Sequence, residues 1–341
     1  MIRLGVIGNG RIAARFVKGA EMVPEVQIVC IYNPRKSSAE AFVAKNGIGM
    51  ATDEWEILLS RVDAVYIASP HATHVDYARR ALLGGKHVFC EKPMAFFGKE
   101  ASELFSLASE RGLVLMEAVK TAYCPGYMHL IETAKSGKIG AVRDVEACFT
   151  KLTDPAGREL TDTVYGGALI ELGTYVLLPV IELFGEDPGD VMFYSVKDAK
   201  GLDLFTKVHL GYEEGFGLGK VGLGVKSEGE LIISGTKGYL YAKAPWWLTR
   251  EFEIRYEDPN ERERHTFEFE GDGLHYELQA FVKEIQTDRR DDSRRKRLSI
   301  AFAAVMERFL CSRSPADQKW FRQTKRDGLG SAGNMLGSHQ L

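Results

Sequence analysis

The sequence predicts an α/β protein with two domains. An N-terminal Rossmann domain with a doubly wound parallel sheet is followed by an α+β domain with a large, mostly antiparallel open sheet. The chain has 341 residues, a natural length for two domains. Its first third alternates short apolar runs with amphipathic segments, which is typical of parallel strands covered by helices on both faces. Further along, β-like runs separated by Gly-rich turns indicate antiparallel strands.

The predicted strands of the first sheet are almost wholly apolar, and helical segments with apolar stripes separate them. The strands are expected at residues 2–7, 26–32, 62–68, 86–90 and 113–118. The helices are expected at residues 11–20, from residue 37 onward, and at 73–83 and 98–111. The second helix is predicted to open with a capping box between Ser37 and Glu40.

The second domain is predicted to combine helices with a succession of short strands. Helices are expected at residues 127–136, 167–184, 274–287 and 298–310. Strands are expected at residues 142–150, 204–212, 230–233, 239–242 and 266–269. These patterns divide the chain into a Rossmann domain at residues 1–120, a substrate-binding and oligomerisation domain at 121–312, and a polar tail at 313–341.

Charge and cysteine usage exclude several function classes. The chain has 44 Lys and Arg against 47 Asp and Glu, which gives no electrostatic reason to expect nucleic acid or an anionic membrane as a partner. The most apolar long segment is interrupted by Glu171, Pro179 and Glu182, so no membrane span is predicted, and the N-terminus lacks a secretory signal pattern. The five scattered cysteines form no C-x-x-C pair, which predicts free thiols and a cytoplasmic location.

Two segments match the glycine fingerprint of dinucleotide-binding proteins. The one at residues 328–333 fits the spacing but follows a polar stretch, so we interpret it as a chance match. The other, Gly8-Asn9-Gly10-Arg11-Ile12-Ala13, follows the first strand and opens the first helix. Gly8 suits the tight turn, Gly10 lets a pyrophosphate approach the backbone, and Ala13 permits close packing. This segment predicts a dinucleotide site at the positive end of the helix.

The end of the second strand favours NADP over NAD. An NAD enzyme usually places Asp or Glu there to accept hydrogen bonds from the ribose 2′-hydroxyl. This chain instead has Asn33, followed by Pro34, Arg35 and Lys36. The two basic side chains could pair with a 2′-phosphate, although a solvated basic turn would look the same. We therefore predict NADP as the cofactor, with NAD possible.

Two further motifs follow predicted strands of the same sheet. Ser69-Pro70-His71 comes after one strand and Glu91-Lys92-Pro93 after the next. Ligands of open parallel sheets bind beyond the carboxyl ends of the strands, so both motifs should border the cleft. A lysine is seldom buried without a partner, and Lys92 is therefore expected to point into this cleft.

Taken together, the motifs resemble the Gfo/Idh/MocA oxidoreductase family. The resemblance rests on the glycine turn, on S-P-H-x-x-H at residues 69–74, on E-K-P at 91–93, and on G-G-A-L-I-E-L-G-T-Y at 166–175. The last motif usually carries Asp and His where this chain has Glu171 and Tyr175. A tyrosine at that position is similar to the dimeric dihydrodiol/xylose dehydrogenase branch. The resemblance covers the chain to about residue 310.

The resemblance implies an NAD(P)-dependent dehydrogenase or reductase that transfers a hydride to or from a sugar or vicinal diol. Lys92, Tyr175 and Glu171 would be its catalytic residues, and the C-terminal sheet would form a homodimer or higher oligomer. The residues expected to bind the coenzyme are Gly8, Asn9, Gly10, Arg11, Ile12, Ala13, Asn33, Arg35, Lys36, Ser69, Pro70, His71, His74, Glu91, Lys92 and Pro93. A non-catalytic NADP-binding sensor of the same fold is the alternative.

The proposed chemistry is also plausible from the residues themselves. Glu171 and Tyr175 are spaced i and i+4, so they share one helix face. A phenol has an ordinary pKa of about 10, and a nearby ammonium such as that of Lys92 is expected to lower the pKa of Tyr175. The alternative is that Tyr175 is an ordinary core tyrosine.

Several other residues have more than one interpretation. His71 and His74 lack the companions of a zinc site, so no metal is predicted, and a place beside the cofactor or at a helix cap fits better. Trp246 and Trp247 suit a substrate platform or, preferably, sheet packing and subunit contact. The segment that holds Glu117, Lys120 and Tyr123 suits a substrate pocket or hinge packing equally well.

Overall fold

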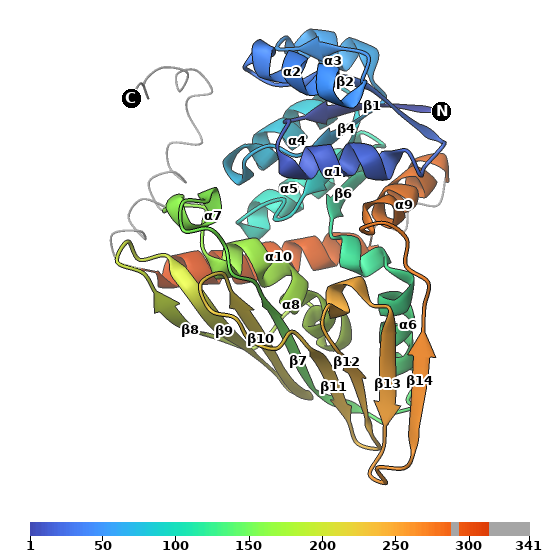
Figure 1. Ribbon diagram of the computed structural model, residues 1–341, viewed down its shortest axis with the longest axis vertical. Helices are drawn as coiled ribbons and strands as arrows, with labels where there is room; N and C mark the ends of the chain where they lie inside the picture. Colours follow the sequence, from blue (N-terminus) through green and yellow to red (C-terminus); the bar gives the residue numbers. More distant parts are fainter. Residues whose placement is uncertain (288–292, 314–341) are drawn as a thin grey trace.

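The computed structural model describes residues 1–287 and 293–313, and it has two sheets stacked along the long axis of the molecule (Figure 1). The first is a six-stranded parallel sheet in the order β3-β2-β1-β4-β5-β6, the Rossmann order. Its strands are β1 (Ile2–Ile7), β2 (Val26–Tyr32), β3 (Ala51–Thr52), β4 (Ala64–Ile67), β5 (His87–Glu91) and β6 (Leu115–Ala118). Its helices are α1 (Arg11–Ala20), α2 (Lys36–Asn46), α3 (Trp55–Arg61), α4 (His74–Leu83) and α5 (Gly98–Glu110).

The predicted elements of this domain are present, with two differences. The capping box is wrong: α2 begins at Lys36 with Arg35 as its N-cap, and no side chain caps it. Ser37 already lies inside the first turn, where its hydroxyl cannot act as the cap. The strand β3 and the helix α3 were not predicted, because two and seven residues give too short a pattern for periodicity to detect.

The second sheet has eight strands in the order β14-β13-β12-β11-β7-β10-β9-β8. All neighbouring pairs are antiparallel except β7 and β10, which are parallel. The strands are β7 (Val142–Thr150), β8 (Asp190–Lys197), β9 (Asp203–Tyr212), β10 (Gly215–Gly222), β11 (Leu231–Gly235), β12 (Tyr239–Ala242), β13 (Glu251–Arg255) and β14 (Arg262–Thr266). The mostly antiparallel open sheet predicted from the sequence is therefore confirmed.

The prediction is wrong at the edge formed by the last two strands. A strand was expected at residues 266–269, whereas β14 ends at Thr266 and β13 was not predicted. Both strands are rich in charged residues and half exposed. Charged side chains are typical of edge strands such as β14, which carries no apolar residue. In the interior strand β13 the apolar alternation is limited to Phe252 and Ile254, which is too short a pattern to predict a strand.

Helices cover one face of the second sheet and link it to the first (Figure 1). The remaining helical elements are α6 (Pro125–Lys135), α7 (Arg158–Thr161), α8 (Ala168–Phe184), α9 (Leu274–Gln286), α10 (Ser293–Ser312), and the 3₁₀ turns η1 (His71–Thr73), η2 (Lys120–Tyr123) and η3 (Trp246–Leu248). The apolar helix α8 packs on β7 and β10, and α10 packs against both α8 and α5.

The helix α9 returns to the first domain, although it comes late in the sequence. It packs against α1, beside which it lies in Figure 1. Its residues Leu274, Leu278 and Phe281 belong to the same buried core as the first sheet, and Phe281 stacks on Phe89 with ring centroids 5.1 Å apart. This packing brings one face of α9 to the cleft between the two sheets.

The division at residues 120 and 312 remains a prediction. Residues 314–341, which include the chance glycine match and nearly all of the predicted tail, lie outside the described residues. Within the residues that are described, no helix is both long enough and apolar enough to cross a membrane.

Candidate active site

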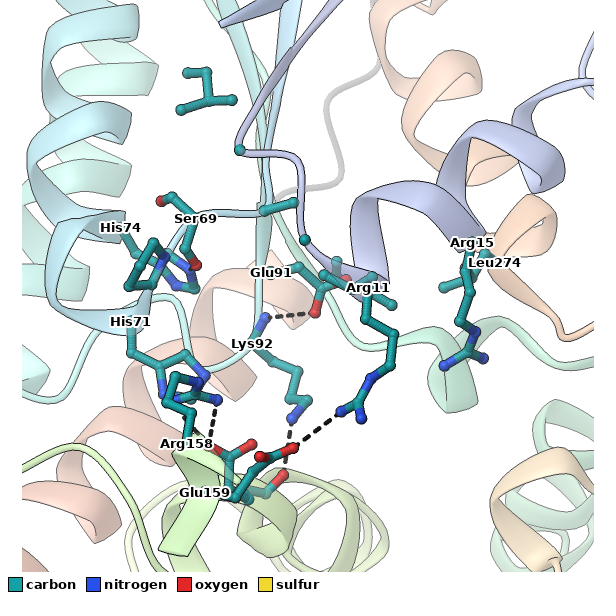
Figure 2. Close-up of a pocket in the computed structure, with 18 of the residues that line it drawn as sticks. Arg11, Arg15, Ser69, His71, His74, Glu91, Lys92, Arg158, Glu159 and Leu274 are labelled. Carbon is teal, nitrogen blue, oxygen red and sulfur yellow. Dashed lines mark hydrogen bonds and ion pairs between the residues drawn. The ribbon is translucent and has the colours of Figure 1, made fainter. Parts of the chain in front are cut away.

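A cleft with a volume of about 910 Å³ lies at the carboxyl ends of β1, β4 and β5 (Figure 2). Residues of α7, α8 and η3 from the second domain also line it. The cleft lies where the strand order reverses between β1 and β4, which is the usual ligand position in such sheets. It therefore coincides with the place at which the sequence motifs were expected to meet.

The glycine turn after β1 fits a dinucleotide pyrophosphate. Gly8 has φ +102°, and a Cβ on it would lie 2.5 Å from the backbone oxygen of Ala68, so only glycine fits there. A Cβ on Gly10 would meet nothing within 4 Å, so open space faces this part of the turn. No side chain caps α1, and its first turn carries no acidic residue. The helix N-terminus is thus available to an anion.

A network of amides organises the end of β2. The side chain of Asn33 donates to the Oδ1 of Asn9 at 2.9 Å, and Asn9 donates to Ser38 at 2.7 Å. The backbone N–H of Arg35 donates to Asn33, and the exposed Arg35 lines the cleft. Lys36 is exposed as the first residue of α2 and is not part of the cleft lining. Arg35 is accordingly the better placed of the two basic residues to meet a 2′-phosphate.

The S-P-H-x-x-H motif forms η1 and the start of α4, and its two histidines differ in environment. His74 is fully buried, with Nδ1 2.9 Å from the backbone oxygen of Pro93 and Nε2 2.9 Å from that of Ser69. Its ring therefore ties the turn after β4 to the turn after β5. In His71, by contrast, Nδ1 has no hydrogen-bond partner among the described residues. Burial holds the pKa of His71 well below its ordinary value, so the ring is neutral.

Lys92 reaches across the cleft to the second domain. Its Nζ donates to the backbone oxygen of Glu171 at 2.8 Å and lies 5.4 Å from the ring centroid of Tyr175 (Figure 2 shows the first contact). Lys92 lies in the turn after β5, whereas Glu171 and Tyr175 both lie on α8. The structure thus brings together Lys92, Glu171 and Tyr175, the three residues that the sequence suggested for catalysis.

The carboxylate of Glu171 is paired with other side chains of the protein. Its Oε1 accepts a hydrogen bond from Arg158 of α7 at 2.7 Å and lies 3.9 Å from Nδ1 of His71 (Figure 2). Only 8% of Glu171 is exposed. Arg158 was missed in the sequence, because the short helix that carries it follows an irregular Gly- and Pro-containing segment without periodicity.

The expected effect of Lys92 on Tyr175 is wrong for this structure. Burial raises the pKa of Tyr175 above its ordinary value, and the nearby carboxyls of Glu91 and Glu277 raise it further. The ammonium of Lys92 lies over the face of the ring. The phenol of Tyr175 is therefore protonated at neutral pH. In this state it can donate a proton, and it can accept one only after it has lost its own.

Aromatic residues form another part of the lining. The ring of Phe149 on β7 stacks on Trp247 with centroids 3.6 Å apart, and it meets the edge of Tyr175 at 5.1 Å. Trp246 is fully buried and donates to the backbone oxygen of Cys148 at 2.8 Å. The same two interpretations were given to both tryptophans from the sequence, but of the two only Trp247 lines the cleft.

The segment that runs from β6 into η2 serves both of the roles considered for it, and Glu117 lies on β6 itself rather than after it. Glu117 is buried and accepts the backbone N–H of Met94 at 2.8 Å, which is a packing role. Lys120 lines the cleft and donates to the backbone oxygen of Asp272 at 2.7 Å. Glu277 of α9 also lines the cleft and was missed. Its spacing from Leu274 and Phe281 places it on the apolar face of its helix, which is the signal that could have identified it.

Comparisons with known proteins agree with this geometry. The model of an oxidoreductase family with an NAD-binding Rossmann fold matches residues 2–119. A scyllo-inositol 2-dehydrogenase (NADP(+)), IolU of Bacillus subtilis (strain 168), is 34% identical over 62% of this chain and 67% of its own length. A trans-1,2-dihydrobenzene-1,2-diol dehydrogenase of Bos taurus is 30% identical over 74% of this chain and 78% of its own.

Solved structures extend the similarity to both domains. KijD10, a 3-ketoreductase from Actinomadura kijaniata in complex with NADP and TDP-benzene, superposes with a TM-score of 0.76. The match covers 90% of this chain and 96% of that structure at 26% identity. The arrangement of the two sheets is therefore shared along nearly the whole chain.

Proposed function

Because the chain belongs to the Gfo/Idh/MocA oxidoreductase family, we propose that it is an NADP-dependent enzyme that interconverts a hydroxyl and a carbonyl group on a sugar, polyol or vicinal diol. The observation that carries the proposal is the contact between Lys92 and α8. This contact places the ammonium of Lys92 beside the phenol of Tyr175, in a cleft that the glycine turn after β1 also lines.

The coenzyme assignment rests on the glycine turn after β1 and on the turn after β2. The open space at Gly10 and the uncapped α1 suit the pyrophosphate. Arg35 lines the cleft where an NAD enzyme would have a carboxylate, and a cation there favours a 2′-phosphate. The inositol dehydrogenase relative is named for NADP, and KijD10 was solved with NADP. When bound, the nicotinamide supplies or accepts the hydride.

The residues of the chain are proposed to handle the oxygen and the proton. The Nζ of Lys92 donates a hydrogen bond to the reacting oxygen and stabilises negative charge on it. The protonated phenol of Tyr175 gives its proton to that oxygen when a carbonyl is reduced. We propose that Glu171 helps to position Lys92 through its backbone oxygen rather than acting through its carboxylate, which is paired with Arg158.

Two further groups are proposed to orient the ligands. The unpartnered Nδ1 of His71 is an acceptor for a substrate hydroxyl, since the ring is buried and neutral. The stacked Phe149 and Trp247 offer an apolar wall against which a sugar or diol ring can pack. His74 holds the backbone of Ser69 and Pro93, so its proposed contribution to coenzyme binding is indirect.

We also propose a homodimer or higher oligomer formed through the second sheet. The sheet face away from α8 carries the exposed side chains of Met192, Tyr194, Val196 and Phe216. Apolar residues gathered on one face are typical of a subunit contact. A cytoplasmic location is the matching proposal for the compartment, because four of the five cysteines are buried free thiols.

A coenzyme-coupled screen tests the proposed function. Aldoses, inositols, vicinal diols and dicarbonyls are offered with NADP, NAD and their reduced forms, and absorbance of the reduced coenzyme is followed. Turnover of at least one polyhydroxy compound with NADP or NADPH is expected. Tight binding of NADP without turnover of any compound would favour the sensor alternative and contradict the enzymatic proposal.

A further inference from the structure

A buried ion pair contacts the two-glycine turn that leads into α8. The carboxylate of Asp203, the first residue of β9, and the guanidinium of Arg313, which directly follows α10, are 3.1 Å apart. The two side chains are 0% and 5% exposed. A buried ion pair is weak evidence for stability, because desolvation of the two charges offsets their attraction. The groups that surround this pair therefore indicate what else it does.

The carboxylate of Asp203 holds the first turn of α8. Its Oδ2 accepts the backbone N–H of Leu169 at 2.8 Å and the hydroxyl of Thr206 at 2.8 Å, while its Oδ1 accepts Nη2 of Arg313. The first N–H groups of a helix have no partner within the helix, and a negative charge near them is favoured by the helix dipole. Asp203 therefore fixes the start of α8, although it comes from a different element.

The guanidinium of Arg313 holds the turn that precedes the helix. It donates to the backbone oxygen of Val164 at 3.2 Å, to that of Gly166 at 2.8 Å, and to Asp203 at 3.1 Å. The two terminal nitrogens of one planar fork make these three contacts, which the single ammonium of a lysine reproduces only in part. Arg313 thus ties the turn to β9.

This arrangement also explains the two glycines that open the G-G-A-L-I-E-L-G-T-Y motif. Gly167 has φ +104°, and a Cβ on it would overlap Oδ1 of Asp203 and lie 3.0 Å from Nη2 of Arg313. A Cβ on Gly166 would overlap the backbone oxygen of Asp162. Side chains at these two positions would clash, so the turn approaches the ion pair this closely only with glycine.

Two hydrogen bonds connect the start of α8 to the reacting groups. The backbone N–H of Glu171 donates to the oxygen of Gly167 at 3.1 Å, and the backbone oxygen of Glu171 accepts Nζ of Lys92 at 2.8 Å. Tyr175 lies one turn further along α8, and the centroid of its ring is 5.4 Å from the same Nζ. A shift at the start of α8 would therefore move the phenol and the acceptor of the ammonium together.

The same turn also contacts the wall of the cleft. Tyr165 lies between the two residues whose backbone oxygens Arg313 binds, and its ring stacks on Phe96 with centroids 4.8 Å apart. The ring of Phe96 meets the edge of His71 at 6.1 Å, and His71 lines the cleft. The ion pair is thus linked through this turn to the imidazole as well as to α8.

We propose that Asp203 and Arg313 are positioning residues of the active site. They hold the turn before α8 and so keep Lys92 and Tyr175 in the arrangement that meets the reacting oxygen. This inference rests on the roles proposed above for those two residues. Neither member of the ion pair belongs to the lining of the cleft, so both act through α8. A pair that only stabilised the fold would affect the whole protein alike, whereas a positioning pair changes the start of α8 within the folded state.

The first test needs no substrate and follows amide hydrogen exchange in the full chain. Arg313→Met removes the guanidinium, so peptides that cover residues 164–175 should exchange at least about tenfold faster. Arg295→Met is the matched control, because it removes a half-buried ion pair with Glu284 from the helix that precedes Arg313. It should leave these peptides unchanged. Unchanged exchange in Arg313→Met, or an equal increase over the whole protein, would overturn the positioning role.

Asp203→Asn repeats this test from the other member of the pair, and it decides the question if Arg313→Met does not fold. The variant keeps the size of the side chain and loses the charge that faces Arg313, which weakens the hydrogen bonds it accepts. The same peptides should exchange faster, by a smaller factor. Exchange at the wild-type rate would count against the proposal.

The second test uses a substrate found in the screen, at a temperature at which every variant is folded. Arg313→Met should lower kcat at least about tenfold with NADP affinity unchanged, because misplaced reacting groups slow the chemical step. Arg313→Lys, which keeps the charge but not the fork, should recover part of this loss. Arg295→Met should keep the wild-type kcat.

Two outcomes of the kinetic test would overturn the proposal. One is a wild-type kcat in Arg313→Met, and the other is an equal loss of kcat in Arg295→Met. A screen that finds no substrate would instead count against the proposed function. The exchange experiment would still decide whether the ion pair holds the start of α8.

Discussion

The ammonium of Lys92 donates a 2.8 Å hydrogen bond to the backbone oxygen of Glu171 and so links the turn after β5 to the helix α8 of the second domain. This bond lies inside the cleft, where a substrate oxygen can replace the carbonyl as acceptor. It explains how a charged side chain is held in place before any ligand enters. It also marks the place at which residues of both domains contribute to the site.

Replacing Lys92 with Met should abolish most of the activity without loss of the coenzyme. The variant keeps the length of the side chain and removes the charge that stabilises the reacting oxygen, so kcat should fall at least about 100-fold. NADP affinity, measured by calorimetry, should change little. Lys99→Met, on the exposed start of α5, is the control. Wild-type turnover in Lys92→Met would remove this lysine from the mechanism.

Tyr175→Phe removes only the hydroxyl and keeps the ring against Phe149. The turnover for carbonyl reduction should fall about 100-fold, because no other phenol lines the cleft beside Lys92 among the described residues. The thermal midpoint should remain close to that of the wild type. Steady-state kinetics and unfolding measured on the same preparation check both statements. A variant as active as the wild type would make Tyr175 a packing residue.

Coenzyme preference should depend on Arg35. A charged hydrogen bond to a 2′-phosphate contributes about 1.5–3 kcal/mol, so Arg35→Ala should bind NADP about 10- to 100-fold more weakly. NAD lacks this phosphate, and its affinity should be unchanged. Titration of both coenzymes into the variant, with Arg79→Ala at a surface ion pair as the control, measures the difference. Equal losses for NADP and NAD would contradict the assignment.

The fold was largely predictable, because two separate features of the sequence indicate the first sheet. Its strands are continuous apolar runs, and its glycine turn stands between a strand and a helix, so pattern and motif agree. The strands β13 and β14 were not identified, since both are short and rich in charged residues, and β14 lies at the edge of the sheet. The candidate site was predictable only where a motif follows a strand, as at Lys92.

The residues that were missed owe their position to tertiary structure. Arg158 lies on a single helical turn and reaches Glu171 only because the chain folds back. Glu277 comes from a helix that returns to the first domain after the whole second sheet. The burial of Tyr175 and the approach of Glu91 and Glu277 also arise from tertiary structure, which is why the expected pKa shift had the wrong sign.

Stability should decrease between pH 4.5 and pH 7 partly because of Glu117. Burial raises the pKa of its carboxyl from 4.5 to about 7. The folded state then binds a proton that the unfolded state has already released, so the free energy of unfolding falls as the pH rises through this window and levels off above it. Glu117→Gln should flatten the curve between these pH values. Chemical unfolding at several pH values measures it, and an unchanged slope would mean that Glu117 is ionised in the folded protein.

The open face of the second sheet should be a subunit contact. Phe216 on β10 is 67% exposed, and Phe216→Asp places a charge on this face. The wild type should have at least the mass of a dimer by light scattering, and the variant should be a monomer. Met128→Asp, at an exposed position of α6, should leave the mass unchanged. A monomeric wild type at micromolar concentration would contradict the proposed assembly.

The central claim is that Lys92 and Tyr175 together meet the oxygen that reacts. A crystal structure with NADP and a substrate found in the screen tests it most directly. The account predicts that this oxygen lies within hydrogen-bonding distance, about 3 Å, of both the ammonium and the phenol. An oxygen bound elsewhere in the cleft, with the ammonium of Lys92 still held by Glu171, would contradict it.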